Sequence, residues 1–194
     1  MQTEDVAGIQ GVAQEVGIAL KGEAYGIDVA VKYPDPAAAI LDYGLMKATQ
    51  TASKSVSLVN TGKYAVAFAF HQRGAMMKEL FTITPAEGNL APGTQQAVEL
   101  AFNRGQVLKR EVTLADRTDI TVAITEPLTG RKEVTLPVKI SARAVFSKYS
   151  ITPARALNFG PAMYNTSTGP RTLEVTNVGE VPVNLRLFDP AKGL

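Results

Sequence analysis

The sequence predicts an all-β protein, an immunoglobulin-like antiparallel β-sandwich that forms part of a tandem repeat. Short segments of alternating apolar and polar residues follow one another along the chain, separated by glycine, proline and asparagine. Strands every 8 to 15 residues or so with turn residues between them are typical of sandwiches. No segment shows a convincing amphipathic helix, and one strand–turn–strand pattern occurs twice.

The repeated pattern relates two stretches of the chain at a constant separation of 117 residues. Leu-Asp-Tyr-Gly at 41–44 and Leu-Asn-Phe-Gly at 157–160 precede the two stretches and lie 116 apart. Self-similarity at a fixed separation is the sequence signature of repeated structural units, so we expect tandem β-domains. The matched positions are Val56 and Leu173, Leu58 and Val175, Asn60 and Asn177, Gly62 and Gly179, Val66 and Val183, Phe68 and Leu185, and Phe70 and Leu187.

A second similarity fixes the expected domain boundaries. Residues 16–24 alternate as a strand does and match residues 138–144 at a separation of 120. Each of these segments comes shortly before one copy of the repeat. We therefore expect residues 1–25 to hold the closing strand of an upstream unit, residues 26–146 to form a complete unit, and residues 147–194 to begin the next. The last segment would leave its apolar residues without an opposing sheet, and would be either less ordered or completed by contact with its neighbour.

Within the complete unit, alternation of apolar residues predicts each strand in turn. The expected strands are residues 27–31, 55–59, 64–70, 81–83, 96–103, 107–114, 120–124 and 134–140. Between them we expect extended chain at residues 37–40, an irregular excursion at 74–79, a double turn at 87–93 and a hairpin turn at 127–130.

Composition excludes several classes of protein. The net charge of +2 is too small for the concentrated basic face of a nucleic-acid-binding domain. The chain has no cysteine, which excludes disulfides and thiolate metal sites. The first residues include acids where a signal peptide has basic residues, and the longest apolar run is far shorter than the ~20 residues of a membrane helix. We expect a cytoplasmic, soluble protein with no membrane or nucleic-acid partner.

Residues for catalysis are scarce. His71 is the only histidine, expected in a loop after its strand, and no Gly-x-Ser-x-Gly motif accompanies it. Asp116 and Asp119 do not make a metal site with one distant histidine. Gly88 and Gly93 have phosphate-loop spacing, but a threonine stands where the lysine is required, so we interpret them as a turn. We expect no enzyme, no cofactor and no small-molecule substrate.

The ordered motifs resemble the ASH domain, a family related in fold to the major sperm protein (MSP) and the pilus chaperone PapD. They are Leu-Asp-Tyr-Gly at 41–44, Val-Ser-Leu-Val-Asn-Thr-Gly at 56–62, Phe81-x-Ile83-x-Pro85, and Gly-x-Leu-x-Pro-Gly at 88–93. The run 142–153 is similar to linkers in a multi-ASH protein of the central-pair apparatus of motile cilia. The resemblance implies a scaffold in the cytoskeleton of the ciliary or flagellar axoneme. Its implied partners are other axonemal and central-pair proteins, with microtubules as a further candidate.

The basic residues Lys109, Arg110, Arg143, Lys148 and Arg155 are the candidates for protein contacts. The alternative is that these charges are solvated and keep strand edges soluble. An MSP-type adaptor that binds a short peptide motif is the second functional hypothesis, and a basic groove would favour it. A relative of the pilus chaperones is a third, which would require a signal peptide.

Two pairs of apolar residues have expected roles in packing. Met76 and Met77 form either an adaptable contact patch or a plug at the open end of the sandwich. Val145 and Phe146, in the linker, are expected to pack between adjacent units and to limit hinge motion.

Overall fold

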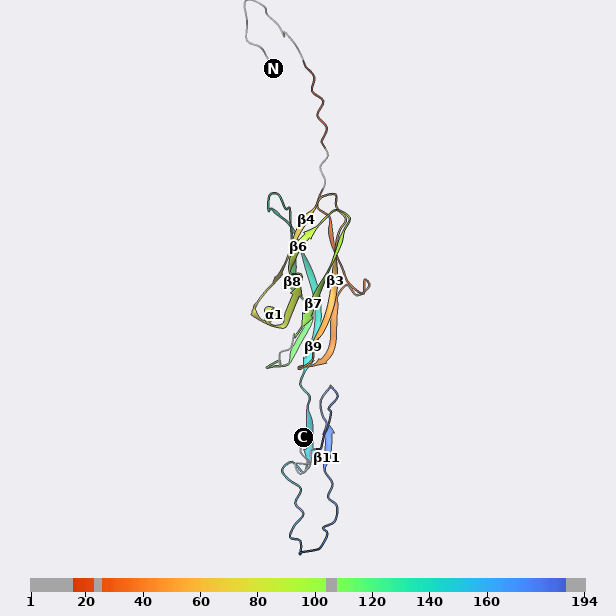
Figure 1. Ribbon diagram of the computed structural model, residues 1–194, viewed down its shortest axis with the longest axis vertical. Helices are drawn as coiled ribbons and strands as arrows, with labels where there is room; N and C mark the ends of the chain where they lie inside the picture. The colour runs from red at the N-terminus through yellow and green to blue at the C-terminus, as the bar shows by residue number, and fades with distance from the viewer. Residues whose placement is uncertain (1–15, 23–25, 104–107, 188–194) are drawn as a thin grey trace, which may run out of the picture.

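Two sheets pack face to face to form the predicted immunoglobulin-like sandwich (Figure 1). The computed structural model describes residues 16–22, 26–103 and 108–187. The four-stranded sheet has the order β1 (Val29–Lys32), β3 (Ala52–Asn60), β7 (Gln95–Phe102) and β5 (Phe81–Thr84). The five-stranded sheet has the order β2 (Leu41–Lys47), β9 (Lys132–Val145), β8 (Val112–Thr125), β4 (Val66–Gln72) and β6 (Glu87–Leu90).

The core lies between the two sheets and is built from alternate residues of each strand. In β3 the side chains of Val56 and Leu58 are buried, while that of Ser55, the residue before Val56, is exposed. The same alternation confirms most of the predicted strands, because successive side chains of a strand point to opposite faces. Each large apolar side chain buried in this way contributes about 1.5–3 kcal/mol. The largest fully buried side chains are Phe102, Leu41, Leu58, Met77, Leu100, Ile120, Ile124, Ile140, Val56, Val66, Val98 and Val122.

One tyrosine joins the two sheets through the core. The Tyr43 hydroxyl, on β2, donates a hydrogen bond of 2.6 Å to the carbonyl oxygen of Leu100 on β7. The centroid of its ring lies 5.7 Å from that of Phe81, in an edge-to-face arrangement, and 5.9 Å from that of Phe102, in a tilted one. Burial, and to a lesser degree the charge of Glu99, raises the pKa of the Tyr43 phenol well above its usual value.

The pairing of β2 with β9 is parallel, in a sandwich whose other described strand pairings are antiparallel as predicted. Leu41 pairs with Ile140 and Lys47 with Val145, with an irregularity between Asp42 and Leu45. The reason is that the chain changes sheets after β1. It enters the five-stranded sheet at its edge, where it runs alongside the last strand of the unit instead of forming a hairpin with a neighbour. A non-local pairing of this kind leaves no mark in local periodicity.

A short helix, α1 (Ala75–Leu80), occupies the stretch that was predicted to be irregular. Met77 and Leu80 are buried and lie three residues apart, on one face of the helix. Met77 therefore fills the core, as the plug interpretation expected, whereas Met76 is only partly buried. No helix among the described residues is long and apolar enough to cross a membrane.

Strand β6 replaces the first half of the predicted double turn at residues 87–93. Gly88 pairs with Phe68 of β4, and a Cβ at Gly88 would lie 2.9 Å from the phenylalanine ring. Only glycine lets the backbone approach the ring this closely. Gly93 has a φ of +70° and makes the following turn. The two glycines with phosphate-loop spacing thus have backbone roles.

The segment before β2 is a turn, whereas extended chain was expected at residues 37–40. The Asp35 carboxylate accepts hydrogen bonds from the amides of Ala37 at 2.9 Å and Ala38 at 3.4 Å. The amide of Ala39 donates to the Asp35 carbonyl at 3.1 Å. An aspartate that satisfies its own neighbouring amides favours a turn over a strand.

The β8–β9 hairpin is longer than predicted. Residues expected to form strands at 107–114 and 120–124 lie, where described, in the single strand β8 or just before it, with irregular pairing around Arg117. The predicted hairpin turn at 127–130 is confirmed. Gly130 has a φ of +67°. The carboxylate of Glu126 accepts hydrogen bonds from the Thr129 hydroxyl and from the amides of Leu128 and Thr129, and these bonds lower its pKa.

The second copy of the repeat forms a separate two-stranded sheet below the sandwich in Figure 1. This sheet pairs β10 (Tyr149–Thr152) with β11 (Glu174–Asn177). Residues 183–187 form no strand, unlike the matching residues in β4. Leu185 and Leu187 are exposed. As expected, these apolar residues have no opposing sheet among the described residues.

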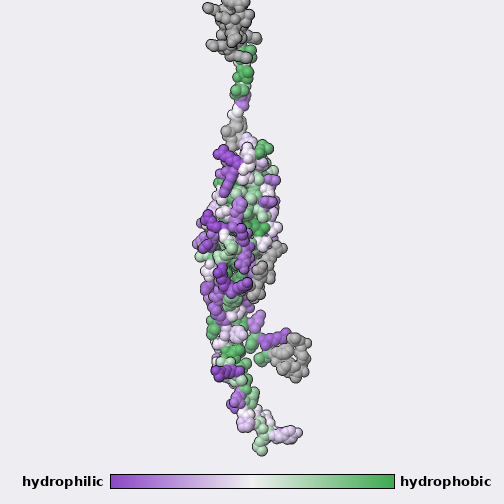
Figure 2. All heavy atoms as spheres, turned by 90° about the vertical axis from the view of Figure 1, so that its left-hand side faces the viewer, coloured by the Kyte–Doolittle hydropathy of each residue, from purple (hydrophilic) through white to green (hydrophobic). Residues whose placement is uncertain are grey.

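At the other end of the sandwich, residues 16–22 project away without forming a strand (Figure 1). The alternating apolar residues of this segment, Val16, Ile18 and Leu20, are all strongly exposed (Figure 2). The strand expected at residues 16–24 is not present in 16–22, because no described segment pairs with it, and residues 23–24 are outside the described ranges. Its assignment to an upstream unit stays a prediction.

Candidate interaction site at the junction between the two units

The junction begins where β9 leaves the sandwich and the chain continues toward β10. Val145 is buried at the end of β9, and its carbonyl oxygen accepts a hydrogen bond of 2.8 Å from the amide of Ala48. Phe146 is partly buried and packs against the core of the complete unit. Both linker residues therefore pack on the complete unit, which anchors the start of the linker, and their packing between adjacent units stays a prediction.

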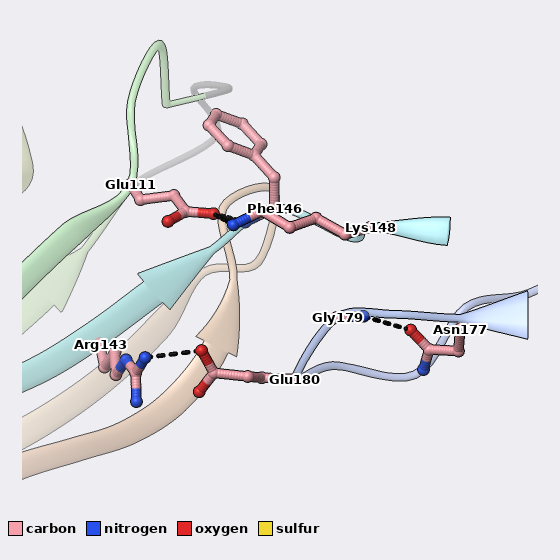
Figure 3. A network of polar contacts seen from close by, with 7 residues as sticks. All are labelled: Glu111, Arg143, Phe146, Lys148, Asn177, Gly179 and Glu180. Atoms are coloured by element: carbon pink, nitrogen blue, oxygen red, sulfur yellow. Dashed lines mark hydrogen bonds and ion pairs between the residues drawn. The ribbon is translucent and has the colours of Figure 1, made fainter. Parts of the chain in front are cut away.

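The first ion pair of the junction joins the linker to the complete unit. The ammonium of Lys148 lies 2.8 Å from the carboxylate of Glu111, which stands just before β8 (Figure 3). The same carboxylate accepts a hydrogen bond of 3.4 Å from the amide of Phe146. The hydrogen bond from Lys148 lowers the pKa of Glu111 most, and the one from the Phe146 amide lowers it further, because both favour the charged carboxylate.

The second ion pair joins the turn after β11, in the second unit, to strand β9 of the complete unit. Arg143 of β9 lies 2.6 Å from the carboxylate of Glu180, in the turn that follows β11 (Figure 3). Both side chains are about half exposed, at 51% and 50%. Half-exposed pairs of this kind contribute about 0.2–1 kcal/mol each. Their effect is on the orientation of the second unit more than on the stability of the fold.

In the complete unit, the turn between β3 and β4 is organised by Asn60. Its buried amide donates hydrogen bonds to the carbonyl oxygens of Tyr64 at 2.7 Å, Leu90 at 3.1 Å and Ala91 at 3.3 Å. Its side-chain oxygen accepts one of 3.0 Å from the amide of Gly62. One side chain thus closes the turn and ties it to β6.

The same turn recurs after β11 in the second unit. The amide of Asn177 donates to the carbonyl oxygen of Val181 at 3.1 Å, and its oxygen accepts from Gly179 at 3.0 Å. Both bonds have a counterpart 117 residues earlier in the chain. The turn is therefore repeated in its hydrogen bonds as well as in its sequence. Within it, Glu180 occupies the place that Lys63 holds in the complete unit.

The start of the second unit also matches that of the first. Tyr149 pairs with Asn177 as Val29 pairs with Asn60, so β10 corresponds to β1 at a separation of 120. The residue before each strand accepts a hydrogen bond from the turn. Asp28 accepts from Thr61 at 2.9 Å and Lys148 from Val178 at 3.1 Å, both through carbonyl oxygens. Lys148 therefore stands at the position of Asp28.

The structure brings two of the five predicted contact residues together at the junction. Arg143 and Lys148 each form one of its ion pairs, and Arg155 is exposed and forms no ion pair with another described residue. The acidic partners Glu111 and Glu180 were not predicted, because each is 37 residues from its base, outside any local pattern. A comparison of charges at equivalent repeat positions could have found Glu180.

Lys109 and Arg110 lie instead at a surface hollow beside α1. The hollow has a volume of about 340 Å³ and combines these two cations with apolar side chains and one acid. Its lining residues are Met76, Glu79, Leu80, Leu108, Lys109, Arg110 and Val112.

Groups for metal or acid–base chemistry are dispersed. Among the described residues, no cluster of three or more histidine, aspartate or glutamate side chains could hold a metal ion. His71 is exposed and lies within β4, paired with Thr121, and not in a loop as predicted. Asp119 pairs with Arg117 at 2.6 Å.

The two-sheet sandwich defines the class of this protein as an immunoglobulin-like domain. A family model described as "HYDIN/CFA65/VesB-like, Ig-like domain" matches residues 37–139, more than half of the chain. The chain belongs to this family.

Two mammalian proteins show the similarity in sequence. The human hydrocephalus-inducing protein homolog is 29% identical over 197 residues, covering 97% of this chain. The mouse hydrocephalus-inducing protein is 26% identical over 191 residues, covering 95%. The chain spans 4% of the length of each. The multi-ASH protein whose linkers resemble the run 142–153 is hydin, the hydrocephalus-inducing protein, and the expected relationship to it is confirmed.

Two solved structures with similarity to this chain are a PapD-like domain and an MSP-domain protein. The seventh PapD-like domain of human CEP192, an ASH/PapD-like domain, has a TM-score of 0.44 at 15% identity, and covers 70% of this chain and 99% of that one. The MSP-domain protein SSP-19 of Caenorhabditis elegans has a TM-score of 0.38 at 17% identity, and covers 56% of this chain and 97% of that one.

Proposed function

We propose that the protein is a non-enzymatic scaffold module of the motile-cilium axoneme, in the central-pair apparatus. Immunoglobulin-like units follow one another along the chain and mediate protein–protein contacts needed for ciliary beating. This proposal rests on the junction between the two units. There two ion pairs and an anchored linker hold a second copy of the repeat against the end of the first.

The two ion pairs restrain the second unit at separate points. Lys148 belongs to the linker and Glu180 to the turn after β11, while Glu111 and Arg143 belong to the complete unit (Figure 3). A single pair would act as a pivot, whereas two pairs also oppose rotation about it. Because all four side chains are well exposed, the two pairs orient the second unit more than they stabilise it.

The axonemal location is supported by the ASH resemblance and by the hydrocephalus-inducing relatives. Cross-linking mass spectrometry on intact axonemes tests it, through amine-reactive links from Lys109, Lys132 and Lys148. We expect links to central-pair proteins. Lys132→Arg is the matched control, since it keeps the charge and removes the reactive amine. Links confined to cytosolic or membrane-contact proteins would overturn the ciliary proposal.

A second candidate, a peptide-motif adaptor of the MSP type, is favoured by the hollow beside α1. There Lys109 and Arg110 stand over apolar side chains, an arrangement suited to an acidic peptide with one apolar anchor. Glu79 in the lining weakens the basic character. Fluorescence titration with an acidic peptide tests this candidate. The adaptor predicts binding that Lys109→Glu with Arg110→Glu abolishes and Lys132→Glu leaves unchanged, and equal affinity in all three proteins would contradict it.

A further inference from the structure

We propose that the outer face of the four-stranded sheet binds a second copy of the chain, through two reciprocal ion pairs between Lys32 and Glu99. The outer face consists of the strand residues whose side chains point away from the core, such as Ser55 and Ser57 on either side of the buried Val56. In the proposed dimer, Lys32 of each copy contacts Glu99 of the other. The inference goes beyond the proposed function and does not depend on a location in the axoneme.

The outer face carries one base and one acid among uncharged side chains. The charged residues of the four strands are Lys32, Lys54 and Glu99. Lys54 pairs with the fully buried Leu100 and therefore belongs to the core-facing side of the sheet. Only Lys32 and Glu99 remain on the outer face. Depletion of charge is typical of the central part of a protein interface.

Lys32 and Glu99 do not neutralise each other within one copy. Lys32 pairs with Ser57 and Glu99 with Ser55, so the two charges lie on opposite sides of β3. From the strand spacing and the rise per residue, their Cα atoms are about 12 Å apart. Both residues are exposed, and among the described residues neither forms an ion pair or a side-chain hydrogen bond. Both charges are therefore available to a partner.

A hollow beside Glu99 has room for a basic side chain from outside the unit. It has a volume of about 440 Å³, and the hydroxyl-bearing residues Ser53, Thr82 and Thr84 contribute to its lining. A lysine ammonium has three hydrogen-bond donors and no acceptor, so a carboxylate surrounded by hydroxyl oxygens suits it. The chemistry of the hollow therefore favours a lysine as its occupant.

The same face supplies the lysine that the hollow accepts. A two-fold axis that lies in the interface and passes over β3 between Ser55 and Ser57 brings each Lys32 over the Glu99 of the other copy. Such an interface is isologous, so each contact occurs twice. The serine side chains at the axis are short and let the two sheets approach each other. A second copy therefore satisfies both charges at once.

The size of the outer face predicts weak association. Four strands about 4.8 Å apart and about six residues long cover roughly 400 Å² per copy. Stable interfaces bury about 800 Å² per partner, so this face belongs to the weak, transient class. Chains that carry several such units in series would add these contacts, because linked sites bind with higher avidity. The contact suits the side-by-side alignment of two chains.

Sedimentation velocity of the full chain over a range of concentrations tests the inference. We expect a concentration-dependent dimer, and Lys32→Glu or Glu99→Lys should each weaken it at least about tenfold, because like charges then meet twice. An equimolar mixture of these two variants should restore the dimer, since both ion pairs of the mixed dimer join opposite charges. Lys139→Glu, on β9 of the other sheet, is the matched control and should associate as the native chain does.

Restoration by mixing excludes loss of the fold as the cause of the weakened association, because both variants must be folded to form the mixed dimer. Circular dichroism of each variant provides the same control independently. Native-like association of both single variants would overturn the inference, and so would a mixture of folded variants that stays monomeric. A native chain that is monomeric at all concentrations would also overturn it. None of these substitutions touches the junction between the two units, so the proposed function is tested separately.

Discussion

Replacing the asparagine of the repeated turn should have very different effects in the two units. In the complete unit, Asn60 is fully buried and its amide donates to three carbonyl oxygens, of Tyr64, Leu90 and Ala91. Asn60→Ala removes these hydrogen bonds and leaves buried carbonyls without that donor. At about 1–3 kcal/mol for a buried group left unsatisfied, we expect a loss of roughly 2–3 kcal/mol in the free energy of unfolding.

The matched control is Asn177→Ala, the equivalent change in the second unit. Asn177 is exposed and lies outside the core cluster, so water replaces its partners. We expect less than about 0.5 kcal/mol, the range of ordinary surface substitutions. Urea unfolding of the full chain, followed by the core of the complete unit, measures both. Equal losses for the two variants would refute the interpretation of one turn in two different environments.

Three further predictions concern the sandwich and its junction. Tyr43→Phe should cost about 0.5–1.5 kcal/mol at neutral pH. Because burial raises the pKa of Tyr43 in the folded state, stability should fall as pH rises above about 10, where tyrosine ionises in the unfolded chain, and the phenylalanine variant should lose this dependence in unfolding experiments. Gly88→Ala places a methyl group 2.9 Å from the Phe68 ring and should cost about 1–3 kcal/mol, whereas Gly169→Ala, with open space around it, should leave the midpoint of thermal unfolding unchanged. The lowered pKa of Glu111 means that its contribution to the junction is present above the unfolded-state pKa of about 4.5 and is lost as pH falls through the lower folded value. A carboxyl titration by nuclear magnetic resonance that gives an ordinary pKa for Glu111 would contradict this contact.

Local patterns were sufficient for most strands and insufficient where a tertiary contact decided the structure. Alternation identified β3 and β7 because their inward residues face a continuous core. Strand β6 was mistaken for a turn because Gly88, needed for the close approach to Phe68, is also a turn residue. Helix α1 has six residues, too few to show helical periodicity.

The candidate site was predictable only in part, for the same reason. Arg143 and Lys148 were found because basic residues near a linker are visible in the sequence. Glu111 and Glu180 were missed because their contacts depend on how the second unit sits against the first. Lys109 and Arg110 were chosen as contact candidates by charge alone, and the structure places them at the hollow beside α1.

The most direct test of the account is whether the junction ion pairs hold the second unit in place in the full chain. Spin labels at introduced cysteines, Thr135→Cys on the complete unit and Thr176→Cys on β11, give the distance distribution across the junction. We expect one narrow distribution for the native charges, a broader one for Glu180→Arg, and a return to the narrow one when Arg143→Glu is added. A distribution of the same width in all three proteins would contradict it.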